Sequence, residues 1–325
     1  MMKVVYKKDV YLAEKTENYI LKILAYFSVF NYPLTKDDIR RFLHPGANPA
    51  SLDVALKYLV TEKCIYKIDE FYLLQDDPTL VTARRDGNLR AEKLLPRAIK
   101  IGKFLSGFPY VTGIGISGSL SKKYAHDKAD IDFFIITKAN RLWIARTFMH
   151  LFKKLTFITG KQHYYCMNYY LDEKALRLRD HTIYTAMEIF TLIPVKGEGL
   201  PGFYKANDWV SEWFASYSTA IEDRRISTSK PVIRRMAEWM FNNKVGDKLD
   251  NYLMRMTTRR WRKKEQLGKR NYEGKEMALV TGKHYAWSNP DSFQEKIVTL
   301  YNKKLAELQT KWPAHFEEVS FSFEK

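Results

Sequence analysis

The chain has 325 residues, of which 46% are hydrophobic and 14% aromatic, and its formal net charge is +17 at pH 7. The hydrophobic and aromatic content excludes a chain that is disordered throughout, and the length predicts two or three domains. The positive charge favours polyanionic partners, namely nucleic acid, nucleotides or anionic lipid, over partners that are themselves positively charged.

The two cysteines, Cys64 and Cys166, stand beside apolar or aromatic residues and lack the spacing of a zinc site. Two unpaired thiols in a chain of this length indicate a reducing compartment, and we expect the cytoplasm. No stretch of about 18 apolar residues is present, and the first residues carry charges where a signal peptide needs an apolar run. We therefore expect neither a transmembrane helix nor a membrane partner.

Residues 1–78 are predicted to form a winged helix-turn-helix-like domain. Apolar residues recur at helical spacing from Glu17 onward, and Thr35 and Ser51 are typical N-caps of a second and a third helix. Two short strands are predicted next, at residues 65–68 and 71–74. This order is typical of a winged helix. The third helix carries Lys57 as its only basic residue, which favours a role in packing or protein contact over one in reading DNA.

Residues 79–200 are predicted to form a second domain, which begins with a long basic helix over 79–107. Strands and helices then alternate: the predicted strands are 111–117, 131–137 and 163–171, and the predicted helices are 142–157 and 183–192. This alternation predicts a mixed sheet with flanking helices. Residues 201–325 are predicted to form a third region that is mainly helical.

The densest basic tract of the chain lies in this third region and comprises Arg255, Arg259, Arg260, Arg262, Lys263, Lys264, Lys269 and Arg270. At helical spacing Arg255, Arg259 and Arg262 share one face, with Trp261 nearby, and such a face could bind the backbone of RNA or DNA. A solvated helix face explains the same residues equally well. Both interpretations stay open.

Two aspartates separated by one apolar residue, Asp130 and Asp132, stand at the start of the second predicted strand. Because side chains alternate across a strand, both carboxylates are expected on the same face. Carboxylates this close repel each other unless a cation lies between them, and Mg²⁺ prefers carboxylate oxygens together with substrate phosphates. The pair therefore predicts a metal site formed by Asp130 and Asp132.

The first predicted strand ends in Gly118 and Ser119. A glycine there allows the backbone to approach a ligand closely, and the serine offers a hydroxyl and a backbone amide to a phosphate. Lys122 and Lys123 follow within one turn and could neutralise phosphate charge. We expect these four residues to bind a nucleoside triphosphate opposite the metal, as in-line attack on an α-phosphate requires.

This segment resembles the nucleotidyltransferase superfamily, whose fold DNA polymerase β and poly(A) polymerases share. The family joins Gly-Gly or Gly-Ser to an Asp-x-Asp or Asp-x-Glu pair, and Gly118-Ser119, ten intervening residues and Asp130-Ile131-Asp132-Phe133 resemble that pattern. The resemblance implies an α+β fold, two metal-binding aspartates, Mg²⁺ as the metal and an NTP, with ATP expected, as donor of a nucleoside monophosphate. The whole chain is also similar to an uncharacterised bacterial group that joins a winged helix to such a domain.

Members of the family carry a third carboxylate on a later strand, where it activates the attacking hydroxyl. The third predicted strand has Asn168 at its centre, and an asparagine can bind a metal through its carbonyl oxygen but cannot accept a proton at neutral pH. Asp172 is expected to lie too far along the strand, and Glu188 is more typical of a surface or N-cap partner. Asn168 is therefore assigned to the catalytic set together with Asp130 and Asp132.

Two functions stay open on these residues. The first is a Mg²⁺-dependent nucleotidyltransferase with a substitute base, acting on a nucleic acid, a protein or a small molecule. A toxin or defence enzyme that modifies tRNA or a partner protein is a special case of it. The second is a non-catalytic regulatory protein that binds a nucleotide or a nucleic acid and retains a degenerate site.

Overall fold

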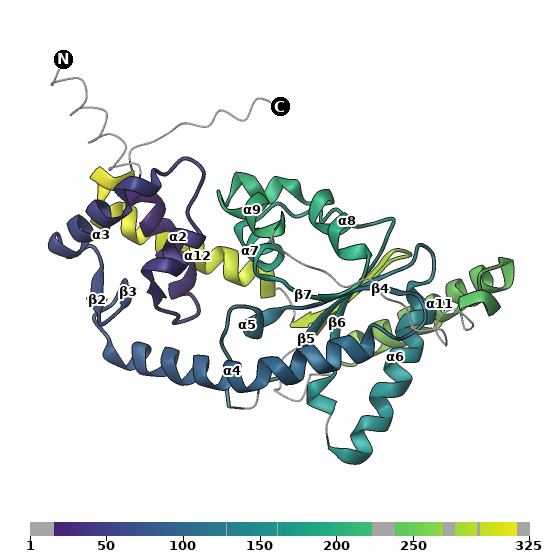
Figure 1. Ribbon diagram of the computed structural model, residues 1–325. Helices are drawn as coiled ribbons and strands as arrows, with labels where there is room; N and C mark the ends of the chain where they lie inside the picture. Colours follow the sequence, from purple (N-terminus) through teal and green to yellow (C-terminus); the bar gives the residue numbers. More distant parts are fainter. Residues whose placement is uncertain are drawn as a thin grey trace. The chain divides into compact units, whose positions relative to one another are not determined.

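The computed structural model describes residues 16–127, 129–160, 162–222, 238–268, 277–290 and 293–316 (Figure 1). These residues form two compact units. The first contains described residues 16–85, 209–219 and 294–316, and the second contains those between 86 and 208 and between 220 and 293. Residues 201–325, predicted as a region of their own, are thus divided between the two units. None of the described helices is long and apolar enough to cross a membrane.

The first unit begins with the helical residues 16–28. Its further elements are β1 (Leu34–Thr35), α2 (Lys36–Arg41), α3 (Leu52–Thr61), β2 (Tyr66–Ile68), β3 (Phe71–Leu73), the first residues of α4 (Pro78–Leu105) and most of α12 (Phe293–Lys311). The strands form an antiparallel sheet in the order β1-β3-β2. Strand β1 is not among the predicted strands, because two residues carry no periodicity that could reveal them.

The predicted N-cap at Thr35 is confirmed, whereas that at Ser51 is only partly right. The Thr35 hydroxyl accepts a hydrogen bond from the Asp38 amide at 3.1 Å, and the Asp38 carboxylate accepts one from the Thr35 amide, so a capping box starts α2. Ser51 occupies the cap position of α3 but makes no capping hydrogen bond. A 3₁₀ turn precedes that helix, and Asn48 caps the turn instead.

The second unit contains the longer sheet. Its elements are the remainder of α4, β4 (Val111–Ile116), α5 (Gly118–Ser121), β5 (Asp132–Thr137), α6 (Leu142–Thr156), β6 (Cys166–Asp172), α7 (Ile183–Thr191), β7 (Ile193–Lys196), α8 (Gly199–Ala206), α11 (Lys244–Gln266), β8 (Met277–Thr281) and β9 (Tyr285–Pro290). The described part also includes α9 (Tyr217–Glu222), which begins in the first unit. Large apolar side chains of α4, β4, β5, α6 and β6 form one buried cluster in the second unit.

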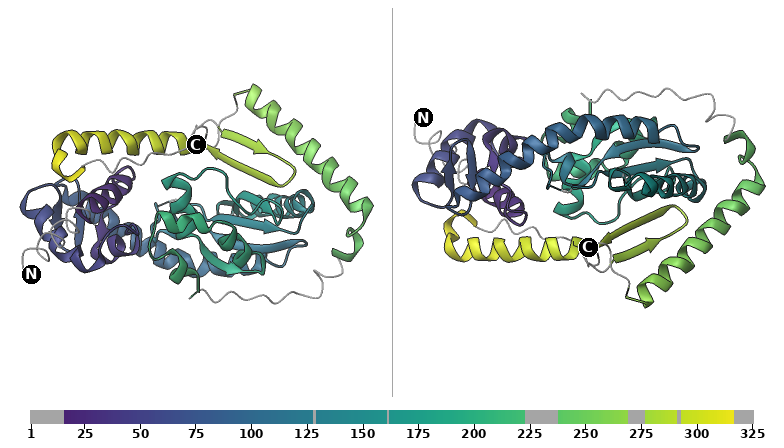
Figure 2. Two further views of the ribbon diagram at one scale, coloured as in Figure 1. Left: turned by 90° about the horizontal axis from the view of Figure 1, so that it is seen from above. Right: turned by 90° about the horizontal axis from the view of Figure 1, so that it is seen from below.

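The sheet of the second unit has the order β7-β4-β5-β6-β9-β8, in which β5 and β6 are parallel and every other neighbouring pair is antiparallel. The predicted α+β class with a mixed sheet is thereby confirmed. Strand β6 begins at Cys166, three residues later than predicted, because residues 162–164 form a 3₁₀ turn. The hairpin β8–β9 is not among the predicted strands; it extends the sheet beyond β6 and lies next to α11 (Figure 2).

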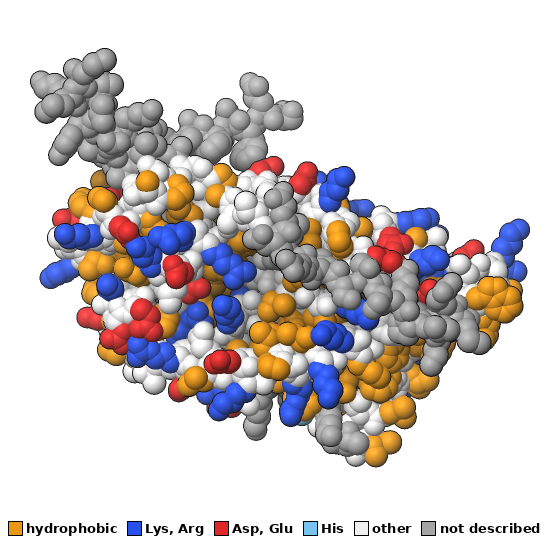
Figure 3. Space-filling model, viewed as in Figure 1, with side chains coloured by type: hydrophobic (Ala, Val, Ile, Leu, Met, Phe, Trp, Pro, Cys, Tyr) orange, Lys and Arg blue, Asp and Glu red, His pale blue; other side chains and the backbone are white. Residues whose placement is uncertain are grey.

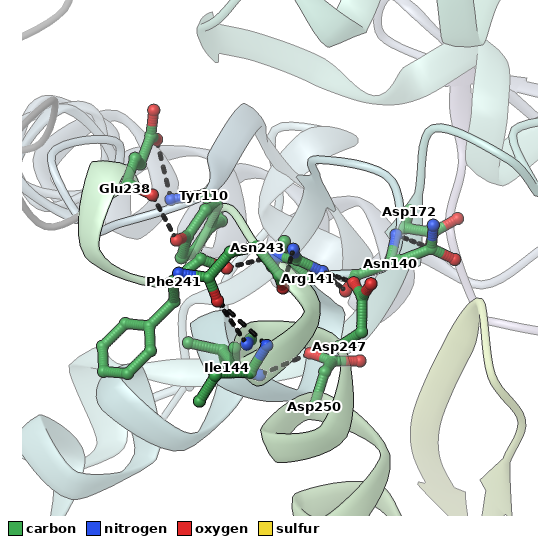
Figure 4. Close-up of polar contacts among 12 residues, drawn as sticks. Tyr110, Asn140, Arg141, Ile144, Asp172, Glu238, Phe241, Asn243, Asp247 and Asp250 are labelled. Atoms are coloured by element: carbon green, nitrogen blue, oxygen red, sulfur yellow. Dashed lines mark hydrogen bonds and ion pairs between the residues drawn. The ribbon is translucent and has the colours of Figure 1, made fainter.

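Polar contacts attach the first turns of α11 to the start of α6 (Figure 4). The Arg141 guanidinium donates to Asp247 at 2.6 Å, and the Asp250 carboxylate accepts from the Ile144 amide at 2.9 Å. Burial raises the pKa of Asp250 to about 6. The side chain of Asn243 caps α11 by accepting from the amides of its first residues. These contacts hold the N-terminal end of α11. The basic residues later in the helix take no part in them and are exposed.

Candidate functional site

One edge of the larger sheet brings together the segments that the sequence singles out. Strand β4 ends there at Ile116 and its antiparallel neighbour β5 begins there, with Ile116 opposite Phe133. Strand β6 runs parallel to β5, so it begins at the same edge, with Cys166 opposite Asp132. Three chain segments that are distant in sequence therefore meet where β4 ends and β5 and β6 start.

The turn after β4 packs directly against the Asp132 carboxylate. Gly118 has a φ of +68°, a conformation that L side chains rarely adopt. A Cβ atom added to Gly118 would lie 2.5 Å from Oδ2 of Asp132, so either the turn or the Asp132 side chain would have to shift. The Ser117 amide also donates to the Asp132 carbonyl oxygen at 3.0 Å. The absence of a side chain at Gly118 is therefore what lets the turn and the carboxylate lie in contact.

The position of Asp130 differs from the prediction. Strand β5 begins at Asp132, so Asp130 precedes the strand, and strand alternation alone does not determine its direction. The chain is nevertheless held beside β6, because the Cys166 amide donates to the Ile131 carbonyl oxygen at 3.1 Å. The Cys166 thiol lies 3.5 Å from Oδ1 of Asn168 and 3.8 Å from Oδ2 of Asp130, so the Asp130 carboxylate lies beside the start of β6, where its charge also acts on Asp132. We call Gly118, Asp130, Asp132, Cys166 and Asn168 the carboxylate edge.

Asn168 donates to Asp132 from a bulge in β6. The pairing of β5 with β6 passes from Met167 opposite Phe133 to Tyr169 opposite Phe134, so Asn168 is the extra residue. Bulges commonly redirect one side chain next to a functional site. Here Nδ2 of Asn168 donates to Oδ1 of Asp132 at 3.0 Å. The asparagine that replaces the expected third carboxylate thus stabilises one of the other two.

The environment of Asp132 opposes its ionisation. Burial, the neighbouring Asp130 and the carboxylate of Glu188 together raise its pKa to about 7, although the Asn168 amide and the Lys153 ammonium act in the opposite direction. Burial and Asp132 likewise raise the pKa of the Cys166 thiol to about 12. The folded chain therefore disfavours negative charge on both Asp132 and Cys166.

The free energy of unfolding should depend on pH because the pKa of Asp132 is raised in the folded protein. In the unfolded chain Asp132 ionises near 3.8 and in the folded protein near 7, so folding binds a proton between these values and stability falls as the pH rises through 7. An asparagine at this position does not ionise, so the folded protein is spared the free-energy cost of a buried negative charge there. In buffer without divalent cations, we expect Asp132→Asn to raise the free energy of unfolding at pH 8 by roughly 1–3 kcal/mol, with a smaller gain at pH 5. Urea unfolding at both pH values measures this, and equal gains at both would contradict it.

The predicted phosphate-binding lysines have different environments. Lys122 donates to Glu188 at 2.7 Å and to the Gly118 carbonyl oxygen at 3.2 Å, so its charge is engaged. Lys123 is exposed and has a φ of +57°. In the part of the chain that the structure describes, the hydroxyl of the half-buried Ser119 has no hydrogen-bond partner. Lys123 and Ser119 are therefore the two predicted groups that remain available to a ligand.

Two of these neighbours, Lys153 and Glu188, are not in the predicted set of site residues. The Lys153 ammonium donates to the Cys166 thiol at 4.0 Å, and no sequence signal connects a lysine of α6 with the start of β6. Glu188 reaches the site from α7 through Lys122 rather than acting as the surface or N-cap partner that its sequence favours. Asp172 lies at the opposite end of β6, where it accepts from the Asn140 amide and contacts Nδ1 of His284, each at 2.8 Å.

The predicted basic face of α11 is exposed at Arg255, Arg259 and Arg262. Trp261 is half-buried and stacks on the Arg146 guanidinium, so it belongs to the packing of the helix and not to that face. Lys269 and Arg270, which belong to the same basic tract, lie outside the described residues.

Comparisons with models of protein families, with curated protein sequences and with solved structures find no match for this chain. Among the described residues, no group of three or more His, Cys, Asp and Glu side chains is arranged to hold a metal ion. The carboxylate edge therefore offers a ligand its two carboxylates and the turn at Gly118.

Proposed function

We propose that the protein is a Mg²⁺-dependent nucleotidyltransferase, which transfers a nucleoside monophosphate from an NTP, with ATP as the expected donor, to the hydroxyl of an acceptor. The observation that carries this proposal is the contact between the Gly118 turn and the Asp132 carboxylate, with Asp130 on the same side of β6. A phosphate-binding turn beside paired carboxylates is the arrangement that metal-assisted phosphoryl chemistry needs.

The electrostatics of the carboxylate edge support a cation there. Burial raises the pKa of Asp132 most, and the charges of Asp130 and Glu188 raise it further, so a divalent cation beside Asp132 would offset the cost of burying its charge and relieve this repulsion. Two carboxylates suit Mg²⁺, which takes oxygen ligands and keeps water and substrate phosphates in its shell. Asp130 and Asp132 would hold the ion. When bound, it would supply positive charge next to the α-phosphate of the nucleotide.

The turn after β4 supports the nucleotide part of the proposal. Gly118 keeps the backbone free of a side chain, and Ser119 offers its hydroxyl and amide to a phosphate. Lys123 is the exposed cation of the turn, whereas Lys122 neutralises Glu188 and holds the Gly118 carbonyl oxygen. In this proposal Lys123 contacts phosphate and Lys122 positions the turn.

Calorimetric titration of the purified protein with ATP tests the proposal. We expect ATP to bind in the presence of Mg²⁺ and at least about tenfold more weakly in EDTA, because a divalent cation held by Asp130 and Asp132 would attract the phosphates and contribute about 1.4 kcal/mol or more. Asp130→Asn should remove the difference between the two conditions. Asp127→Asn is a suitable control, since Asp127 lies in the same spacer but is exposed and paired with Arg90. Failure of ATP and the other NTPs to bind in either condition would contradict the proposed function.

A non-catalytic nucleotide-binding role is the second candidate, and Asn168 is the observation that favours it. Its amide donates to Asp132 and cannot take a proton from an acceptor hydroxyl. Binding of ATP with Mg²⁺ but no transfer of labelled nucleotide to protein, RNA or small-molecule acceptors would support this candidate over the enzyme.

We further propose that the first unit is a winged-helix-like module that contacts protein. Its helices and its β1-β3-β2 sheet support the winged-helix assignment. The outer face of α3 exposes Val54 and Tyr58, with relative exposures of 64% and 45%, and has Lys57 as its only basic residue. A helix that reads DNA usually presents several hydrogen-bond donors, which this face does not. The exposed arginines of α11 are better suited than α3 to bind the phosphate backbone of RNA or DNA.

A further inference from the structure

A buried arginine on α6 has no acidic partner. Arg146 is 8% exposed, and no described carboxylate pairs with it. Its Nε atom is buried and makes no hydrogen bond within the described residues. Three aromatic rings surround the guanidinium, with its central carbon 4.6 Å from the ring centre of Trp261, 5.6 Å from that of Trp143 and 5.8 Å from that of Tyr170. Burial lowers the pKa of Arg146 to about 10.

The next turn of α6 adds a second polar group without a partner. Nε2 of His150 is buried and makes no hydrogen bond to any residue that the structure describes. Burial and the positive charges of Arg146, Lys153, Lys154 and Lys264 all lower the pKa of His150, so the imidazole is neutral and can donate from one nitrogen. The Tyr170 hydroxyl lies above the same helix and has only the Met149 sulfur, at 3.9 Å, as its partner. Three side chains with N–H or O–H donors thus gather without an oxygen acceptor.

The charges around this cluster are of one sign. Every charged group that shifts the pKa of His150 is a cation, and none of Arg146, Lys153, Lys154 and Lys264 forms an ion pair with a described carboxylate. A buried charge without a partner is unfavourable, and contacts with aromatic faces offset only part of that cost. An anion in contact with the guanidinium would remove the deficit. The guanidinium fork matches the oxygens of a phosphate. Lys154 and Lys264, whose charges act on His150, are exposed at the surface.

We propose that Arg146, His150 and Tyr170, with Lys154 and Lys264 at the surface, form a binding site for a phosphate group that is separate from the carboxylate edge. The group could be inorganic phosphate or the terminal phosphate of an oligonucleotide, since the donors recognise the same oxygens in both. The site requires neither Mg²⁺ nor turnover, so it can be tested separately from the proposed nucleotidyltransferase activity.

Thermal unfolding of the full chain in phosphate and in chloride at equal ionic strength tests the site. We expect phosphate to raise Tm by about 2 °C or more, since a ligand that binds only the folded state stabilises it. Arg146→Met keeps the volume and removes the unpaired charge. It should unfold at or above the wild-type Tm in chloride and show no phosphate-dependent rise. Arg179→Met is the matched control, because Arg179 is exposed and belongs neither to this cluster nor to the basic face of α11, and this variant should retain the rise.

A second variant and a second ligand complete the test. His150→Phe keeps an aromatic ring but removes the donor, and it should lose most of the phosphate-dependent rise even if Arg146→Met does not fold.

Fluorescence binding with 5′-phosphorylated and 5′-hydroxyl RNA of one sequence distinguishes free phosphate from the terminal phosphate of an oligonucleotide as the ligand. About tenfold tighter binding of the phosphorylated strand, lost in His150→Phe, assigns the site to a nucleic-acid end, since charge-assisted hydrogen bonds contribute on that scale. Equal binding of both strands with an intact phosphate effect assigns it to free phosphate. A wild type without that effect, or variants that keep it in full, would overturn the proposal.

Discussion

Asp132→Asn is expected to reduce nucleotide transfer by about a thousandfold or more, because a bound metal ion supplies several kcal/mol of transition-state stabilisation and about 1.4 kcal/mol corresponds to a factor of ten. Asparagine keeps the shape of Asp132 and can accept the hydrogen bond from Asn168, so the fold should persist. The measurement is transfer of label from α-³²P-ATP in the presence of Mg²⁺, with the acceptors presented as a mixture of protein, RNA and small molecules.

The matching stability measurement makes the result specific. The same variant is expected to be more stable than the wild type at pH 8, so a loss of transfer cannot be attributed to unfolding. Asp127→Asn removes an exposed carboxylate from the same spacer and should transfer nucleotide at the wild-type rate. Transfer that persists in Asp132→Asn would show that the chemistry does not depend on this carboxylate, and the metal site would have to be abandoned.

Gly118→Ala is expected to lower the free energy of unfolding by about 2–4 kcal/mol and to abolish nucleotide binding. About 1–2 kcal/mol of this comes from placing an L side chain at a φ of +68°, and the remainder from the collision of its Cβ with the Asp132 carboxylate. The collision must move either the turn or Asp132, and both belong to the proposed site. Urea unfolding gives the stability change, and calorimetric titration with ATP and Mg²⁺ gives the binding change.

Gly160 offers a matched control for this substitution. It has a φ of +66°, nearly that of Gly118, but an added Cβ would meet nothing within 4 Å. Gly160→Ala should therefore cost only about 1–2 kcal/mol from backbone strain and leave ATP binding unchanged. Equal losses of stability in the two variants would mean that the collision with Asp132 adds nothing to the cost of Gly118→Ala. The close contact between the turn and the carboxylate would then be contradicted.

Features that depend on neighbouring residues could be predicted from the sequence. The capping box that starts α2 needs only Thr35 and Asp38, three positions apart. The long helix α4 and the amphipathic helix α6 follow from apolar residues at helical spacing, and their bounds differ from the predicted ones by only one or two residues. Gly118 and the two aspartates could be selected because their residue types and spacing have a chemical meaning that does not require coordinates.

Features that depend on distant segments could not be predicted in this way. Which strand lies beside which is decided by packing across the whole sheet, so the hairpin β8–β9 beside β6 has no local signal. The bulge that turns Asn168 towards Asp132 arises from the pairing of two strands and not from the sequence of either. Lys153 and Glu188 reach the carboxylate edge only because α6 and α7 pack where they do.

The sequence by itself determined the α+β composition, the capping box at Thr35 and the residues of the turn and the acid pair, because these depend on interactions within a few positions of the chain. Only the tertiary structure decided that Gly118 contacts Asp132, that Asn168 donates to this carboxylate and that Arg146 is buried without an acid. Each of these is a relation between elements far apart in sequence. Burial and charge at one residue are then fixed by groups that come from other strands and helices.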